Sequence, residues 1–270
     1  KVTGPGDSRV YLLGSFHLLK PQDYPLSPDV EQAFEASQRV VFELSPEDMQ
    51  SPQLASRMVQ AAVRTDGSEL KRDLDAATWQ KLQAFASENK LPLAQMQGMK
   101  PWFVGLSISV GQMQKMGLDP ALGLDRHFME RAQKTGRRTA GLEDIDTQIG
   151  MLDGMTVQEQ RQMLSEALDQ AGKGDEQARQ LHDAWRRGDA EGLWKSMAAD
   201  MRKQYPRLYQ RINVDRNDAW VPKIRQILTQ PGDDDALEIA PEVLRLSAEH
   251  TLCIEGEGDT DATCATLPPV

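Results

Sequence analysis

The sequence lacks the features that mark several common classes of protein. Its 270 residues include only two cysteines, too few for a framework of structural disulfides. No apolar run approaches the ~18 residues of a transmembrane helix. Basic residues number 31 against 41 acidic ones, and this net charge of −10 argues against binding to nucleic acid or to an anionic membrane. We therefore expect a globular chain of one or two domains.

Aromatic residues are scarce as well, at 6%, so we expect Leu, Val, Ile, Ala and the 12 Met to form much of the core. The chain begins at Lys1 with a polar stretch, and we predict a linker over residues 1–8. We interpret this start as that of a mature or trimmed form. Cys253 and Cys264 either close one loop in an oxidising compartment or are two free thiols, and both possibilities stay open.

The first part of the chain predicts a strand, a helix and a second strand. Residues 9–14 are an apolar run that ends in Gly, and residues 39–44 are another. Between them, Ser27 is a natural N-cap and Pro28 suits the first turn of a helix. A strand, helix, strand succession of this kind implies a parallel pair. We expect these two strands to be neighbours in the sheet.

The rest of the chain is mostly helical in pattern. We predict helices between residues 50 and 116, a helix over residues 124–135 that ends at Gly136, and a weak strand over residues 138–142. Residues 156–230 are polar with periodic apolar positions, which predicts an all-helical insertion. The fold class is therefore α/β, with a central mixed or parallel sheet flanked by helices. The domain spans residues 9–230, and residues 231–270 form a divergent C-terminal segment and tail.

Two residues that can bind a metal follow the predicted strands. His17 lies three residues after Gly14, and Glu43 is at the end of the second strand. In open α/β sheets, ligands bind outside the carboxyl ends of the strands. A loop histidine is often structural, but a second polar group at the same edge favours a functional site.

Further candidates come from the middle and end of the chain. Glu143 ends the third predicted strand. Asp125 is equally consistent with a helix cap and with a site residue, and His127 lies two residues beyond it. Since His182 lies in a polar helix, we predict a solvent-exposed surface position.

Residues 216–220 (RNDAW) are unusual in composition. Arg216 offers a planar fork for a carboxylate or an oxyanion. Asn217 is a candidate cap for the helix that follows, and Trp220 a candidate for packing. The pattern suits either a site or a purely structural helix start.

Common catalytic motifs are missing. The sequence has no phosphate-binding glycine loop, no Gly-x-Ser-x-Gly nucleophile elbow and no His-Glu-x-x-His pair. The two cysteines lack Cys-x-x-Cys spacing, so we do not expect zinc bound by thiolates.

Several of these segments together resemble the TraB/GumN family, which includes the Wnt-cleaving TIKI metalloproteases, and they are most similar to its bacterial GumN branch. The resemblance covers roughly residues 9–230. The segments that carry it are residues 11–19 (YLLGSFHLL), 40–43 (VVFE), 123–128 (GLDRHF), 141–143 (GLE), Gln148 and 211–220 with its RNxxW core.

The resemblance implies an α/β fold and a metal-dependent hydrolase, peptidase-like in the TIKI branch. It also implies export, so that we expect a periplasmic or secreted protein. The metal ligands would be His17, Glu43 and His250, and the ion would be Mn, Co, Zn or Fe. One departure is Ser247 where the family has glycine before its second histidine. Pro241 precedes it, so we predict that this last strand is displaced or at an edge of the sheet.

Three functions follow from these residues. In a metal-dependent hydrolase, Glu43, Glu143 and Arg216 would be catalytic, and a peptide or protein substrate would contact Asp125, His127 and Asn217. In a non-catalytic binding protein, the same cleft would hold a peptide or a saccharide. In a metal-free esterase or similar hydrolase, His17 would be the general base. The oligomeric state stays open.

Overall fold

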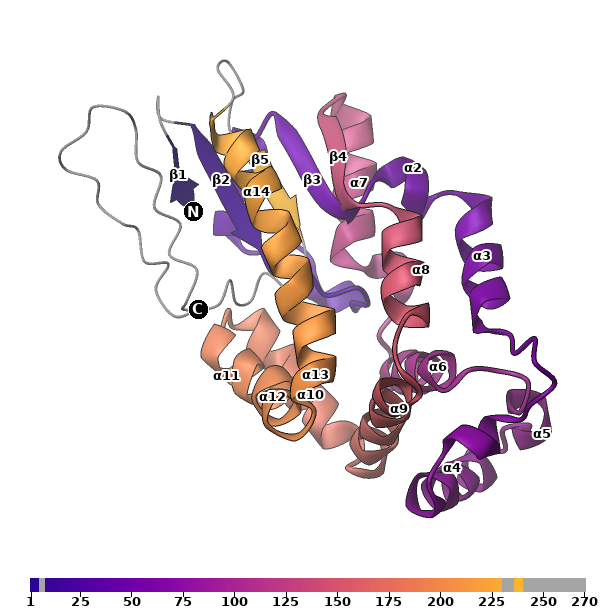
Figure 1. Cartoon of the computed structure of the whole chain (residues 1–270). Coiled ribbons are helices and arrows are strands. Elements are labelled where there is room, and N and C mark those ends of the chain that lie inside the picture. Colours follow the sequence, from indigo (N-terminus) through magenta and orange to yellow (C-terminus); the bar gives the residue numbers. More distant parts are fainter. Residues whose placement is uncertain (5–7, 230–235, 240–270) are drawn as a thin grey trace.

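The structure is a computed structural model that describes residues 1–4, 8–229 and 236–239. Ser247, His250, Cys253 and Cys264 lie outside the described residues. Within the described part, five strands form one sheet in the order β1-β2-β5-β3-β4. The strands are β1 (Val2–Thr3), β2 (Arg9–Leu13), β3 (Arg39–Leu44), β4 (Arg138–Glu143) and β5 (Ala236–Ile239). The pairing of β1 with β2 is antiparallel and the other three pairings are parallel, which confirms the predicted α/β class (Figure 1).

The order of the strands corrects two predictions. β2 and β3 are not neighbours, because β5 lies between them and pairs with both. The predicted displacement of the last strand is also wrong, since β5 is central. β5 ends at Ile239, and Pro241 lies outside the described residues.

The start of the chain is not wholly a linker. Val2 and Thr3 form β1, and their partners on β2 are Val10 and Arg9. Val2 is buried in the cluster that covers one face of the sheet. A two-residue edge strand is too short for the sequence pattern to indicate.

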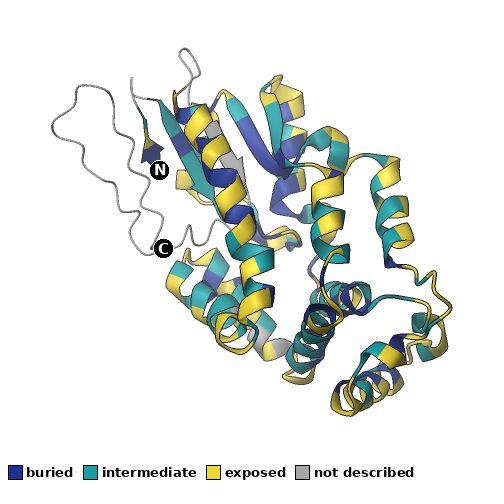
Figure 2. Cartoon of the chain, in the orientation of Figure 1, coloured by how far each residue is buried: buried dark blue, intermediate teal, exposed yellow. Residues whose placement is uncertain are grey.

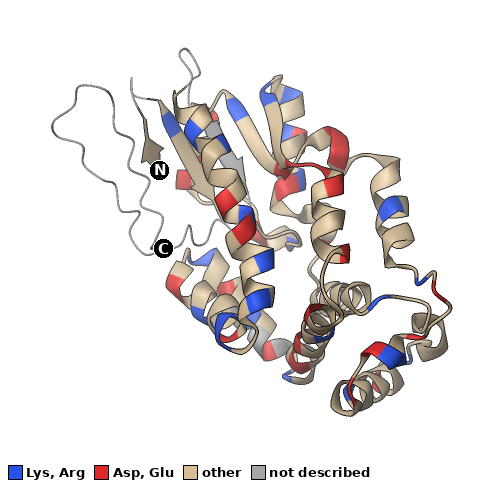
Figure 3. Ribbon diagram, viewed as in Figure 1, with Lys and Arg blue, Asp and Glu red and all other residues tan. Residues whose placement is uncertain are grey.

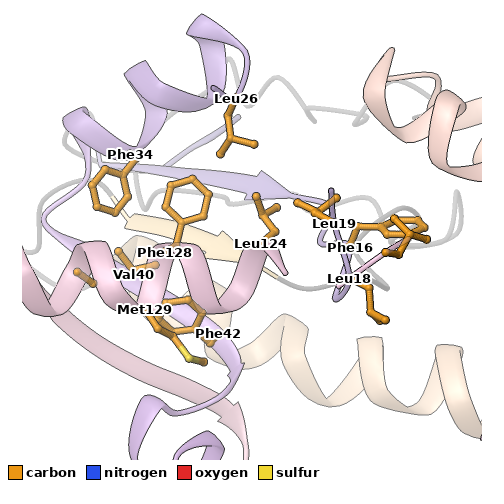
Figure 4. Close-up of a cluster of buried hydrophobic side chains, with 12 residues drawn as sticks. Phe16, Leu18, Leu19, Leu26, Phe34, Val40, Phe42, Leu124, Phe128 and Met129 are labelled. Atoms are coloured by element: carbon orange, nitrogen blue, oxygen red, sulfur yellow. The ribbon is translucent and has the colours of Figure 1, made fainter. Parts of the chain in front are cut away.

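Helices cover both faces of the sheet. Val40 and Phe42 of β3 point to the face covered by α1 (Pro28–Ala36) and α7 (Leu124–Thr135), where Phe34 and Phe128 pack with their ring centroids 5.0 Å apart (Figure 4). Side chains alternate along a strand, so Val41 points to the opposite face. That face is covered by α14 (Asp215–Thr229) through Trp220, Ile224 and Leu228. In Figure 2, β3 is almost entirely buried, whereas β2 and β4 are mostly of intermediate exposure.

The helix ends follow the sequence signals. The Ser27 hydroxyl accepts a hydrogen bond from the backbone N–H of Val30 and caps α1. Gly136 ends α7 in the left-handed conformation, with φ of 65°, which glycine adopts without steric cost. The predicted bounds of α7, residues 124–135, are confirmed.

The remaining helices lie mainly beyond the carboxyl edge of the sheet (Figure 1). α6 (Pro101–Lys115) and α9 (Val157–Gly172) pack against each other and share a buried cluster that includes Val104, Ile108 and Leu164. The last helix of the predicted insertion over residues 156–230, α14, covers one face of the sheet. The helices of this part are α2 (Pro46–Met49), α3 (Pro52–Ala62), α4 (Ala76–Glu88), α5 (Leu93–Met96), α6 (Pro101–Lys115), α8 (Ile145–Asp153), α9 (Val157–Gly172), α10 (Asp175–Arg186), α11 (Ala190–Trp194), α12 (Asp200–Gln204) and α13 (Pro206–Tyr209), with the 3-10 turns η2 (Pro21–Asp23), η3 (Leu70–Asp73) and η4 (Pro120–Leu122) and the π-helical turns η5 (Lys195–Ala199) and η6 (Gln210–Val214).

Candidate functional site

The loop after β2 is held against the start of α7. The backbone N–H of Leu124 donates to the carbonyl of Phe16 at 3.0 Å. At Gly123 the two segments come so close that a Cβ atom would lie 2.1 Å from the carbonyl oxygen of His17. Only glycine permits this approach. As a result, the loop that carries Ser15 and His17 lies beside Asp125, the second residue of α7.

Asp125 holds the imidazole of His17. Its Oδ2 lies 2.8 Å from His17 Nδ1 and also accepts a hydrogen bond from the Ser15 hydroxyl. Burial raises the pKa of Asp125, but the hydrogen bonds and charge of its partners, His17 first, outweigh it and hold the pKa below its usual value. The carboxylate is therefore ionised, and Nδ1 is the donor. The side chain of Asp125 is 7% exposed and that of His17 is 49% exposed, so a buried anion orients a half-exposed imidazole.

Asp125 is not the N-cap of α7. Gly123 occupies the N-cap position of α7, and the Asp125 carboxylate bonds Ser15 and His17 across the loop. The role of Ser15 was missed because a lone serine two residues before a histidine carries no signal of its own.

A second polar cluster lies at the ends of β3 and β4. Glu43 is the last residue but one of β3 and Glu143 is the last residue of β4, and Arg216 of α14 bridges them. Its Nε and Nη2 donate to the two oxygens of Glu143 at 2.8 and 2.9 Å, a bidentate pair, and Nη2 also donates to Glu43 Oε1. All three side chains are at most 10% exposed. Figure 3 shows the acidic positions where β3 and β4 end and α2 begins.

Two further residues support this cluster. Gln148 of α8 donates from Nε2 to Glu43 Oε1. Trp220 donates its indole N–H to Glu143 Oε1 at 2.9 Å, and its ring lies 4.8 Å from the guanidinium carbon of Arg216. The role of Trp220 has a signal in the sequence, because residues four apart share a helix face, as Arg216 and Trp220 do. The role of Gln148 had only the family pattern to indicate it.

The structure brings the candidates together in two groups and not in one. Glu43, Glu143 and Arg216 form one group, and His17 and Asp125 form the other. β5 separates β2 from β3, so two strand spacings, roughly 10 Å, lie between the strand ends that carry the groups. Among the described residues, no group of three or more His, Cys, Asp or Glu lies close enough to hold a metal ion. His250, the third predicted ligand, lies outside them.

The predicted substrate-binding residues His127 and Asn217 are placed differently from Asp125. The ring of His127 packs on Tyr24 with centroids 4.6 Å apart, and burial lowers the pKa of His127. Asn217 is buried inside α14, so the prediction that it caps this helix is wrong. Helical structure already begins before it, in η6. Burial also raises the pKa of Tyr24, to about 12, with the charges of Asp23 and Asp125 adding to the effect.

His182 is buried, which corrects the prediction of a surface residue. Its Nε2 lies 2.8 Å from Asp23 Oδ2, and its ring contacts Phe16 and Trp185. The indole N–H of Trp185 donates to the carbonyl of Gly14 at 3.0 Å. Because α10 is polar in composition, the sequence did not indicate that one face of this helix packs on the loop after β2.

The fold and this edge of the sheet define an α/β protein with two polar clusters outside the carboxyl ends of its parallel strands. The model of the TraB/PrgY/gumN family matches residues 1–235. The chain therefore belongs to the TraB/PrgY/gumN family, as the resemblance indicated. Neither a curated protein nor a solved structure gives a match. In the described part of the chain, no helix is long and apolar enough to cross a membrane.

Proposed function

We propose that the chain is a metal-dependent hydrolase with peptidase-like chemistry, and that its site is the carboxyl edge of the sheet between the two clusters. The observation that carries the proposal is the hydrogen bond between the buried carboxylate of Asp125 and Nδ1 of His17. Histidines that bind metals almost always donate their other ring nitrogen to a carboxylate, a carbonyl or a water in this way. The bond selects the tautomer and directs Nε2 away from Asp125.

The donor set suits a divalent ion of borderline character. His17 and Glu43 would hold the ion, with His250 as the third protein ligand. β5 is the last described strand before His250, and it lies between β2 and β3. Its carboxyl end therefore lies between the strand that precedes His17 and the strand that contains Glu43. Imidazole and carboxylate donors suit Mn, Co, Zn or Fe. The bound ion would activate a water molecule and polarise the scissile carbonyl.

The residues around the ligands have roles of their own in this proposal. Gln148 and Arg216 orient the carboxylate of Glu43 through hydrogen bonds. The bidentate pair with Glu143 holds the guanidinium of Arg216 in one position before a substrate arrives. In that position, Arg216 would stabilise an oxyanion that develops during the reaction. The catalytic roles of Glu43, Glu143 and Arg216, and contacts of Asp125, His127 and Asn217 with a peptide, stay predictions. The periplasmic or secreted location is a proposal that rests on the family resemblance.

A metal-free hydrolase is the second candidate. A histidine that a buried aspartate orients is also the arrangement of a general base, and the described residues contain no group of three metal-binding side chains. In this candidate, His17 would remove a proton from water or from a hydroxyl group. The two candidates differ in the effect of a chelator, which would abolish activity in the first and leave it unchanged in the second.

The test is calorimetric titration of the full chain with Mn²⁺, Co²⁺ and Zn²⁺. We expect one ion to bind, His17→Ala and His250→Ala to weaken binding at least ~100-fold, and Asp125→Asn to weaken it by about 10–100-fold. His127→Ala is the matched control and should leave affinity unchanged.

A chain that binds none of these ions would overturn the metal proposal. Activity against a peptide library that survives a chelator would then favour His17 as a general base. The absence of cleavage with and without metal would favour the non-catalytic binding protein.

A further inference from the structure

A cavity of about 290 Å³ lies in the helical part of the molecule, between α6, α9 and α10 and the turns that follow α11. Its walls are mainly apolar, and four methionines, Met113, Met116, Met163 and Met201, contribute to them. Each of these side chains is half-buried. None of the described residues that line the cavity belongs to the two clusters at the sheet edge, so the cavity is separate from the proposed hydrolase site.

The walls suit a flexible apolar ligand. Methionine is unbranched and polarizable, so a surface rich in methionine adapts to ligands of different shape. A volume of about 290 Å³ is near the lower end of the range for small-molecule sites, which suits one narrow chain and not the helix of a partner protein. The two π-helical turns also reach the cavity, η5 through Ser196 and η6 through Ile212. Turns of this kind are rare and are frequent at functional sites.

The charged residue at the cavity limits the charge that the head group of such a ligand can carry. Among the described lining residues, Glu166 is the only charged one. Its Oε1 accepts a hydrogen bond from Gln170 Nε2 at 2.5 Å, and both residues lie on the same wall. A carboxylate placed at an apolar cavity repels an anionic head group and tolerates an uncharged or cationic one.

We propose that this cavity is a binding site for the alkyl chain of a single-chain amphiphile with an uncharged or cationic head group. The chain would lie among the four methionines, and the head group would remain near Glu166 and Gln170. The proposal goes beyond the hydrolase function and does not depend on it.

The test is calorimetric titration of the full chain with amphiphiles below the concentration at which they form micelles. Dodecyl maltoside and dodecyltrimethylammonium should bind with a 1:1 stoichiometry. Dodecanoate should bind about tenfold more weakly, because Glu166 repels it. Between octyl and dodecyl maltoside, affinity should rise by about fourfold per added CH₂ until the cavity is filled.

Two variants locate the binding. Ala178→Trp fills the cavity from α10 and should abolish binding of dodecyl maltoside, whereas Gln180→Trp, at an exposed position of the same helix, should not. Glu166→Gln keeps the shape of the side chain and removes its charge, so dodecanoate should then bind as tightly as dodecyl maltoside. Circular dichroism checks that each variant is folded.

Absence of saturable 1:1 binding would overturn the proposal. Binding that Ala178→Trp leaves unchanged would do the same, since it would place the amphiphile elsewhere. If Ala178→Trp fails to fold, the comparison of dodecanoate with dodecyl maltoside in Glu166→Gln tests the location of the amphiphile by itself. An unchanged preference against dodecanoate in that variant would show that the amphiphile does not lie beside Glu166.

Discussion

Two histidine–aspartate pairs in this molecule have the same length and opposite environments. His17 and Asp125 are 2.8 Å apart, as are His182 and Asp23. The side chain of His17 is 49% exposed, whereas that of His182 is 6% exposed and that of Asp23 is fully buried. The distance between the partners therefore does not distinguish a site from a structural pair. Exposure does, because a ligand or a substrate can reach only the first imidazole.

The surroundings of the two aspartates explain the difference. Asp23 also accepts from the backbone N–H of Lys20 at 2.7 Å and pairs with Arg186 of α10 at 3.2 Å, so it ties the η2 turn to the helical part. Asp125 accepts from Ser15 and His17, both in the loop at the sheet edge. We infer that the first pair contributes mainly to stability and the second mainly to function.

Asp23→Ala should lower the free energy of unfolding by about 3 kcal/mol, because it leaves buried donors of His182 and Lys20 without an acceptor. Urea denaturation followed by circular dichroism measures this change. Asp183→Ala, at an exposed position next to His182, is the control and should stay within about 0.5 kcal/mol of the unmodified chain. An equal effect of the two substitutions would contradict a structural role for the buried pair.

Asp125→Asn should lower the free energy of unfolding by about 1 kcal/mol at neutral pH, since the amide keeps an acceptor for Ser15 but loses the charge that holds His17. The same denaturation measurement applies. Under the proposed function, this variant also loses metal affinity, which Asp23→Ala should leave unchanged. A loss of metal affinity in Asp23→Ala that equals the loss in Asp125→Asn would remove the distinction between the pairs.

The contribution of Asp125 should disappear in acid. Because its folded pKa lies below the unfolded value of about 3.9, the stability that it contributes is complete above that value. It is lost as the pH falls through the folded pKa. The difference in unfolding free energy between the unmodified chain and Asp125→Asn should therefore shrink as the pH falls below about 4. A difference that grows as the pH falls below about 4 would contradict the lowered pKa of Asp125.

His17→Ala should lower the free energy of unfolding by about 1 kcal/mol, because it removes the hydrogen bond to the buried Asp125 carboxylate, although half of the His17 side chain is exposed. Its effect on hydrolysis or metal binding should be the largest of the series. Thermal unfolding and the metal titration measure the two properties on the same sample. A loss of stability as large as that of Asp23→Ala would mean that His17, like His182, is structural.

Much of the local structure was predictable from the sequence, because its causes are local. β3 and α7 have the predicted bounds, and Ser27 and Gly136 act at the helix ends as their chemistry indicates. The candidate residues at the strand ends also followed from a local rule, since parallel strands all end at the same edge of the sheet. Glu43 and Glu143 do lie together there.

The amino-acid sequence by itself determined β2, β3 and β4, most of the helices, the polar residues near the ends of the strands, and the family to which the chain belongs. Only the tertiary structure decided that β5 enters the sheet between β2 and β3, that Arg216 bridges two glutamates, and that His182 is buried while His17 is exposed. The physical reason is the distance along the chain over which each kind of interaction acts. Capping and periodicity act over a few residues, whereas strand order, burial and ion pairing depend on segments that are more than a hundred residues apart in the chain.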